Sequence, residues 1–150
     1  MERLIIRGRV VIRGEAHGLA LVSREPLSFW GGYDWQTGEI IDRRHPLSGA
    51  IARGRILAIP FTRGSSTTTA VLLEAIRAGT APAAILTTEA DFFFALASVV
   101  ADELYASPVP LCALDGTDFA LLRSGDEIQL SADGVLDVSR AKSIGDRGRS

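Results

Sequence analysis

A run of hydroxyl side chains lies where an apolar segment gives way to a helical pattern, in the stretch PFTRGSSTTTAVLLEAIRAG at residues 60–79. Five consecutive Ser and Thr residues, at 65–69, follow Arg63 and Gly64. The first turn of a helix has backbone N–H groups without intrahelical partners and carries a partial positive charge. These amides, the hydroxyls and the Arg63 guanidinium could bind an anion, and Gly64 would let the backbone approach it closely. The stretch therefore predicts an anion-binding site.

The same positive field could give one hydroxyl a chemical role. It favours the ionised form, so it would lower the pKa of Ser65 or Ser66 and allow that serine to act as a general base. The structural alternative is that Ser65 or Ser66 is an ordinary N-cap and that the threonines fill the first turn. The run lacks the spacing of a phosphate-binding loop and of an acyl-transfer serine. The residues alone leave both interpretations open.

The aromatic segment SFWGGYDWQTG at residues 28–38 is the second candidate, together with the turn residues of 40–49. Aromatic loops are typical of partner surfaces, but these side chains could also form a local cluster that holds a long loop in place. Neither His17 nor His45 has neighbours at a metal-binding spacing, and we expect both to be solvated. The residues expected at a partner surface or substrate mouth are Trp30, Tyr33, Asp34, Trp35, Arg43 and His45.

Composition and charge limit the function further. A net charge of −2 over 150 residues gives no basic surface of the kind that binds nucleic acid. Cys112 is the only cysteine, so it cannot supply the several thiolates of a zinc or iron–sulfur site, and we expect it in the core. Neither a signal-peptide core nor an apolar run near the ~18 residues of a membrane span occurs. We expect a cytoplasmic protein with no membrane partner.

The elements around these residues indicate one α/β domain over 1–150, with β-rich ends and a frayed tail at 141–150. A strand–helix–strand–helix–strand order predicts parallel pairing through right-handed crossovers. The second helix is expected to bury Phe93, Leu96, Ala97, Val100 and Leu104. The predicted elements are β segments at 4–12 and 18–23 separated by Gly14, a short hairpin-like return at 31–42, buried strands at 55–61, 83–88 and 109–114, helices at 66–78 and 89–106, and a hairpin at 126–139.

Two segments, GGYDWQTGEIIDRRHPLSG at 31–49 and IPFTRGSSTTTAVLLEAIRAGTAPAAILTTEAD at 59–91, resemble the small, swivelling-domain subunit of the aconitase X family. The resemblance extends over roughly residues 3–140. It implies a swivelling β/β/α domain, with a β-barrel-like sheet flanked by helices. Proteins of this family pair such a subunit with a large subunit that binds an iron–sulfur cluster. Their known activities are dehydrations, of cis-3-hydroxy-L-proline in bacteria and of mevalonate 5-phosphate in archaea.

The resemblance also implies roles for the hydroxyl run. In the wider aconitase superfamily a Gly-Ser-Ser at a helix start supplies the serine that removes the substrate proton, and Ser65 corresponds to it here. Arg63, Gly64, Ser66 and Thr67 would then bind the substrate. Ordinary aconitases have arginine where this chain has Thr67, which disfavours citrate-like tricarboxylates. Arg63 could take over the role of that arginine.

We therefore expect the small subunit of a two-subunit iron–sulfur hydro-lyase that is active only with its large subunit. No cofactor is expected in this chain, and the cluster is expected in the partner, where it would act as the Lewis acid for the leaving hydroxide. The arginine-rich composition favours the bacterial substrate, cis-3-hydroxy-L-proline, over mevalonate 5-phosphate. A non-catalytic binding module with the same fold is the alternative from another class. The choice of Ser65 over Ser66 rests on analogy alone.

Overall fold

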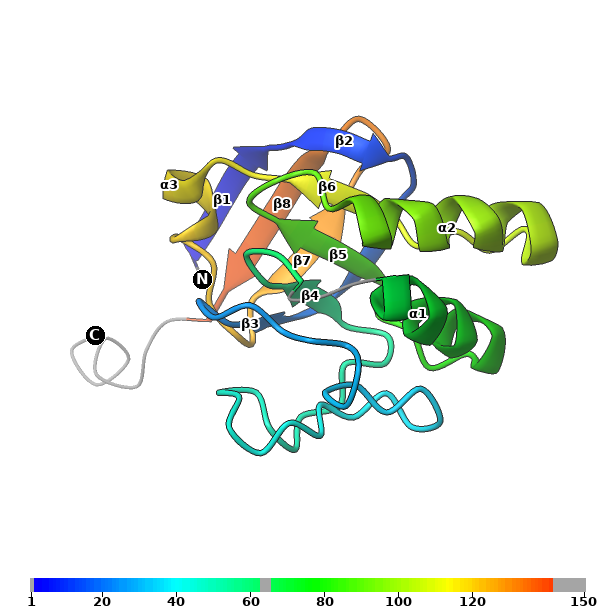
Figure 1. The fold of residues 1–150 in the computed structure, drawn as a ribbon. Helices are drawn as coiled ribbons and strands as arrows, with labels where there is room; N and C mark the ends of the chain where they lie inside the picture. Colours follow the sequence, from blue (N-terminus) through cyan, green and yellow to red (C-terminus); the bar gives the residue numbers. More distant parts are fainter. Residues whose placement is uncertain (1, 63–65, 142–150) are drawn as a thin grey trace.

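The computed structural model describes residues 2–62 and 66–141, which form a mixed β-sheet with two long helices against one face (Figure 1). The eight strands follow one another across the sheet in the order β1-β8-β7-β3-β4-β5-β6-β2. Their bounds are β1 (Glu2–Arg7), β2 (Arg9–Ile12), β3 (Ala16–Val22), β4 (Ile56–Ala58), β5 (Ala84–Thr87), β6 (Leu111–Ala113), β7 (Glu127–Leu130) and β8 (Val135–Arg140). The predicted α/β fold with a barrel-like sheet is confirmed.

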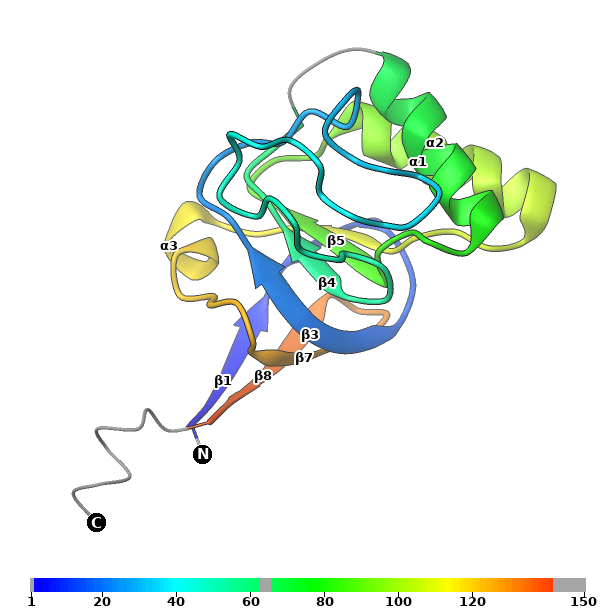
Figure 2. The same cartoon turned by 90° about the horizontal axis from the view of Figure 1, so that it is seen from below.

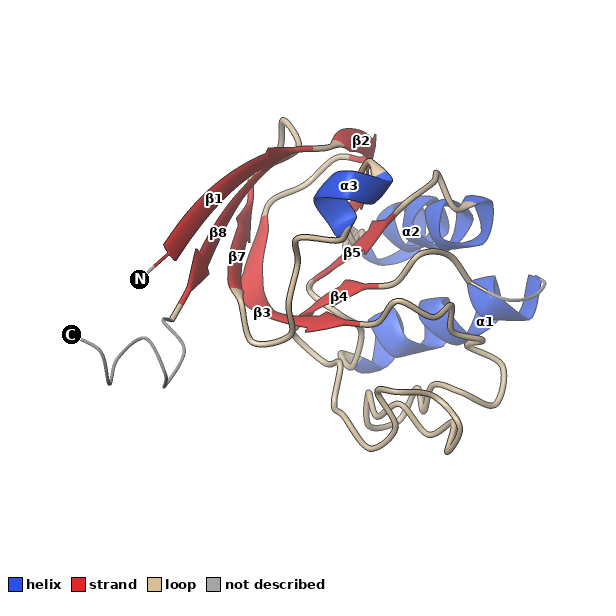
Figure 3. Cartoon of the chain, turned by 90° about the vertical axis from the view of Figure 1, so that its left-hand side faces the viewer, coloured by secondary structure: helices blue, strands red, loops and turns tan. Residues whose placement is uncertain are grey.

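The sheet curls because its two outer strands are consecutive in the sequence. β1 pairs with β8 at one side and β2 pairs with β6 at the other, both antiparallel, with only Gly8 between them. The predicted segment at 4–12 is thus two strands, and the curvature is visible in Figure 3. A Cβ atom at Gly8 would lie 2.4 Å from the Cys112 Sγ atom, so this corner has no room for a side chain. The β7–β8 hairpin turns at Gly134 with φ +85°, as predicted.

The central strands are parallel, as their strand–helix order predicts. β4 pairs with β3 and β5, and β5 pairs with β6, all in parallel register. Strands β4, β5 and β6 are fully buried because their alternate residues face two different cores. Leu57 and Ile85 face the helices, whereas Ile56 and Leu86 face the inside of the curl. The strand predicted at 55–61 ends at Ala58, two residues before Pro60, which has no backbone N–H to donate.

Helix α1 (Ser66–Ala78) has the bounds predicted from the sequence. Leu72 and Ala75 are fully buried on its inner face. Its C-terminus is closed at Gly79, which has φ +77°. The Gly79 N–H donates to the Ile76 oxygen and the Thr80 N–H donates to the Ala75 oxygen, which satisfies two carbonyls that the helix leaves unpaired.

Helix α2 (Phe92–Tyr105) corrects two expectations. It begins at Phe92 rather than at 89, because the Asp91 carboxylate caps its first turn. Of the residues expected on the inner face only Ala97 is buried, while Leu96 is 39% and Leu104 63% exposed. The helix is apolar on most sides, so periodicity does not single out one inner face. The buried residues are Phe94, Ala97, Ser98 and Ala101.

The long segment between β3 and β4 has no regular element and packs on the same core as α1 and α2 (Figure 2). Leu27, Phe29 and Ile40 are fully buried in that core. The predicted hairpin-like return is present as one antiparallel bridge between Tyr33 and Ile40. A short helix that the sequence analysis did not predict, α3 (Gly116–Phe119), packs Phe119 against the other core, inside the curled sheet. In residues 2–62 and 66–141, no helix has both the length and the apolar character needed to cross a membrane.

Candidate active site

Residues 66–69 of the hydroxyl run form the first turn of helix α1, and the chain that leads from strand β4 to this turn lies next to the segment that follows strand β5. Parallel strands bring these two connections to the same edge of the sheet. The Thr88 N–H and Oγ1 both lie 3.0 Å from the Pro60 oxygen, to which they donate. The Thr62 N–H and Oγ1 donate to Asp91 Oδ2 at 3.0 and 2.7 Å. Pro60 and Thr62 are therefore both bonded to the loop that follows β5.

Part of the predicted site lies outside the described residues. Arg63, Gly64 and Ser65, together with the side chain of Ser66, are in this group. The anion pocket and the choice of base remain predictions. What the structure does establish is that α1 begins at Ser66, directly after the proposed base in the sequence.

The threonines of the run have more than one role. Thr69 donates its hydroxyl to the Phe93 oxygen in α2 at 3.0 Å, and Thr68 is 1% exposed. Thr67 lies half-buried in the first turn of α1. At least one hydroxyl of the run therefore joins two helices rather than facing an anion, which agrees with the structural alternative for that position.

Tyr33 is a core residue, which corrects its predicted place at a partner surface or substrate mouth. Its ring stacks on Phe29 at a centroid distance of 4.6 Å, and Phe29 meets Phe94 edge to face at 5.0 Å. The Tyr33 hydroxyl donates to the Thr80 oxygen at 2.8 Å, and burial raises its pKa above the ordinary value. For this residue the hypothesis of a local aromatic cluster is the right one.

His45 is also interior, which corrects the expectation that it is solvated. It is 6% exposed, and its Nδ1 accepts the Leu47 N–H at 3.1 Å. His17 is exposed, as expected. Asp34 closes its own turn by accepting the Gln36 N–H at 2.8 Å.

Two tryptophans and an arginine complete the predicted set. Trp30 is 70% exposed, Trp35 packs partly buried against the core, and Arg43 is exposed. Only Trp30 and Arg43 thus present most of their side chains to solvent.

The structure nevertheless brings the aromatic segment and the hydroxyl run together. Leu27 forms a parallel bridge with Thr62, so the chain that leads to Trp30 runs beside the entry to the run. Asp91 lies on the other side of Thr62. Asp91 is not among the residues predicted from the sequence, although an aspartate before the apolar run FFFALA is a recognisable N-cap signal.

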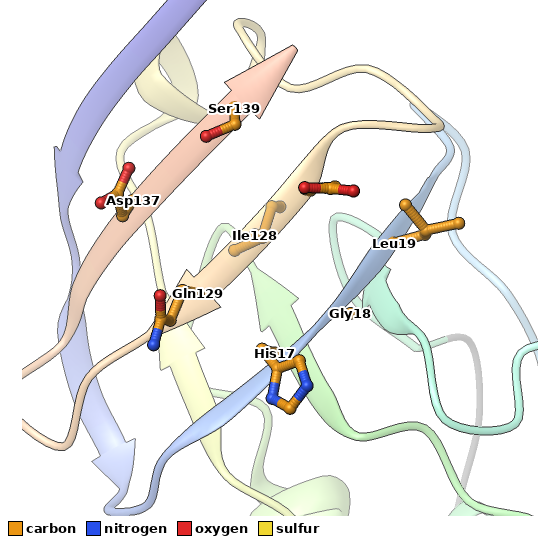
Figure 4. A pocket seen from close by; sticks show the side chains of 8 residues that line it. His17, Gly18, Leu19, Ile128, Gln129, Asp137 and Ser139 are labelled. Carbon is orange, nitrogen blue, oxygen red and sulfur yellow. The ribbon is translucent and has the colours of Figure 1, made fainter. Parts of the chain in front are cut away.

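A hollow on the outer face of the sheet is separate from this site (Figure 4). It is lined by strands β3, β7 and β8, whereas α1 and α2 pack over β4, β5 and β6 (Figure 3). Its polar side chains include His17, Gln129 and Asp137, which are the outward members of alternating strands. Asp137 is already paired with Arg3. We therefore do not assign this hollow to the chemistry of the hydroxyl run.

The cysteine content and the described metal-ligand side chains bear on whether this chain could hold a cluster. Cys112 is its only cysteine, and burial raises the pKa of that thiol to about 11, as is usual for a core residue. Within the described ranges, no three His, Cys, Asp or Glu side chains come together as metal ligands.

Comparisons with known proteins agree on one family. Residues 5–138 match the model of the aconitase X swivel domain. The chain is 46% identical to a cis-3-hydroxy-L-proline dehydratase of Pseudomonas aeruginosa, over 91% of this chain but only 23% of that protein. It is 38% identical to the phosphomevalonate dehydratase small subunit of Methanothermobacter thermautotrophicus, over 83% of this chain and 92% of that subunit. The crystal structure of holo aconitase X from Thermococcus kodakaraensis matches with a TM-score of 0.80 at 31% identity, covering 91% of this chain and 99% of that chain.

Proposed function

The chain belongs to the aconitase X swivel-domain family, and from this membership we propose that it is the small subunit of a two-subunit dehydratase. Its match to an archaeal small subunit covers 92% of that subunit. The same residues correspond to 23% of the Pseudomonas dehydratase, so most of that relative lies outside the match. The proposed partner is a large subunit equivalent to that remainder.

We propose cis-3-hydroxy-L-proline as the substrate. The support is the 46% identity to the Pseudomonas dehydratase, compared with 38% to the archaeal small subunit. Mevalonate 5-phosphate is the second candidate, because an arginine beside a helix N-terminus also suits a phosphate group.

In this proposal Ser65 removes the proton from the substrate carbon, and the substrate loses hydroxide from the neighbouring carbon to form a double bond. The observation that carries the assignment is the start of α1 at Ser66. The helix has its positive end there, which favours an alkoxide at the preceding serine. Arg63, Gly64, Ser66 and Thr67 would bind the substrate carboxylate. We assign the iron–sulfur cluster to the large subunit, since Cys112 is the only cysteine of this chain.

The test begins with the tagged chain, isolated from its native host with whatever large subunit accompanies it. The eluate is assayed for iron and for dehydration of both candidate substrates. Ser65→Ala should lower kcat by roughly 10²- to 10⁴-fold while the complex still assembles, because a general base contributes about that much. Ser66→Ala tests the choice of serine: because Ser66 is proposed to bind the substrate carboxylate, this variant should raise KM more than it lowers kcat.

Thermal melts separate a chemical role from an ordinary cap, whose loss costs only about 1 kcal/mol of stability. Unchanged turnover by assembled Ser65→Ala would contradict the proposal and favour a non-catalytic binding module. A chain that is isolated alone, without iron or activity, would do the same.

A further inference from the structure

The first turn of α2 is tied to the chain on both sides of the segment that contains Ser65. On the entry side, Thr62 donates its N–H and its hydroxyl to Asp91 Oδ2. On the exit side, Thr69 in α1 donates its hydroxyl to the Phe93 oxygen at 3.0 Å. The only residues between Thr62 and the start of α1 are 63–65. Thr62 and Thr69, which lie on either side of residues 63–65 in the sequence, thus both bond to the start of α2.

Asp91 makes more hydrogen bonds than a helix cap requires. Its Oδ1 accepts the N–H groups of Phe93 and Phe94 at 3.1 and 3.2 Å, which completes the cap of α2. Its Oδ2 takes no part in this cap and accepts the N–H and the hydroxyl of Thr62. The side chain is only 7% exposed, so water cannot replace these partners freely. The positive end of α2 offsets the buried charge.

Two further contacts, from Thr88 and Leu27, fix the chain at and near Thr62. Thr88 fixes Pro60 through two hydrogen bonds to the Pro60 oxygen, two residues before Thr62. Leu27 forms a parallel bridge with Thr62 on the side of the long β3–β4 segment. Such supporting contacts are what hold a reacting group within a fraction of an ångström of its working position.

We infer that Asp91 is a positioning residue for the proposed dehydration: through Thr62 it fixes the entry to the Gly64-Ser65-Ser66 segment at the start of α1. The inference rests on the proposed function, because it gives Asp91 a role only if the segment carries the base. Asp91 itself does not touch the substrate in this scheme. It acts through the backbone that leads to Ser65.

Asp91→Asn in the assembled enzyme is the main test. Asparagine is as good an N-cap as aspartate, so its Oδ1 can still accept the N–H groups of Phe93 and Phe94. Its amide nitrogen cannot accept the Thr62 N–H and can only donate to the Thr62 hydroxyl oxygen, so the hydrogen bond that holds the Thr62 backbone is lost while the cap remains. We expect kcat to fall about 10- to 100-fold with KM changed by less than about threefold, since misplacement of a reacting group by about 1 Å costs that much in rate. A raised KM with unchanged kcat would overturn the inference.

Two variants of Thr62 keep the test independent of α2. Thr62→Val preserves shape but removes the hydroxyl donor, and it should lower kcat in the same direction as Asp91→Asn. Thr62→Ser retains the donor and should restore a rate close to that of the unmodified enzyme. Asp115→Asn is the matched control, because Asp115 is the N-cap residue of α3 and makes no side-chain capping bond. If Asp115→Asn lowered kcat as much as Asp91→Asn, the inference would be wrong.

The double variant Ser65→Ala/Asp91→Asn separates failure of the inference from failure of the proposed function. If Asp91 acts through Ser65, Asp91→Asn should have no further effect on the residual rate of Ser65→Ala. Full activity of Ser65→Ala would reject the proposed function itself. A large loss in Ser65→Ala with none in Asp91→Asn would reject only the inference.

Discussion

Two hydroxyl groups tie the long β3–β4 segment to the end of α1. Tyr33 donates to the Thr80 oxygen at 2.8 Å, and the Thr80 hydroxyl donates to the Trp35 oxygen at 2.5 Å. Thr80 directly follows the Gly79 cap and is 4% exposed. Because these groups are buried, their hydrogen bonds are costly to remove. Single residues thus hold the aromatic segment against the C-terminal end of α1.

Tyr33→Phe should therefore lower the free energy of unfolding by about 1–2 kcal/mol, because it leaves the buried Thr80 oxygen without its Tyr33 donor. The phenylalanine ring keeps the stacking on Phe29, so turnover of the assembled enzyme should not change. Denaturant unfolding and a turnover assay measure the two effects. Tyr105→Phe is the control, since Tyr105 is 42% exposed, and it should alter stability by less than about 0.5 kcal/mol. A large loss of kcat in Tyr33→Phe would return Tyr33 to the active site.

At the scale of elements, α1 and α2 lie side by side with their first turns joined by Thr69 and Phe93 (Figure 1). The far end of α1 depends on a glycine conformation. A Cβ atom at Gly79 would meet no heavy atom within 4 Å, but its φ of +77° lies in the left-handed region that other residues adopt at a cost. A substitution at Gly79 therefore tests backbone strain without steric crowding.

Gly79→Ala should destabilise the chain by about 1 kcal/mol, the usual cost of a non-glycine residue in this conformation. Gly116→Ala is the matched control, because that position also has open space but lacks a positive φ. Gly116→Ala should leave the free energy of unfolding of the chain unchanged or raise it by less than about 1 kcal/mol. Equal destabilisation by both substitutions, measured in the same urea titration, would contradict the assignment of the cost to backbone strain.

At the scale of the whole molecule, the curled sheet is held at one corner by a buried ion pair. Asp126, 2% exposed, accepts from the Nε and Nη2 atoms of Arg140 at 2.8 and 2.7 Å. It also accepts the Arg123 N–H at 2.9 Å. Burial by itself would raise the pKa of Asp126, but the hydrogen bonds from Arg140 and Arg123 outweigh it, and the pKa lies below its ordinary value. The pair joins β8 to the turn that precedes β7.

This lowered pKa makes stability depend on pH in a defined direction. A carboxyl whose pKa is lower in the folded state stabilises the fold above its unfolded pKa of ~3.9 and loses that contribution as the pH falls through the folded value. Asp126→Asn should cost about 3 kcal/mol at pH 7, because it removes the buried charged partner of Arg140 and leaves only the exposed Glu2, 3.8 Å away. The difference in stability between Asp126→Asn and the unmodified chain should therefore shrink as the pH is lowered from 5 to below ~3, which thermal melts can measure. A difference that stayed constant with pH would contradict this role for Asp126.

The local sequence determined most of the secondary structure, and it determined the family. The apolar runs of β4, β5 and β6 and the glycine after α1 act within a few residues, so they could be interpreted without knowledge of the rest of the chain. The segments at 31–49 and 59–91 likewise carried the resemblance that the match over residues 5–138 bears out. The Ser65 hypothesis also came from the sequence and remains to be tested by experiment.

Only the tertiary structure determined which side chains are exposed on the surface and which are buried. Tyr33 and His45 resemble surface residues in sequence, but contacts with Thr80, Leu47 and the core bury them. The apolar surface of α2 offered several possible inner faces, and tertiary packing buried the one that carries Phe94, Ala97, Ser98 and Ala101. The link from Asp91 to Thr62 joins residues 29 positions apart. It exists because parallel pairing of β4 and β5 brings the ends of two strands to one edge, a condition that no local pattern contains.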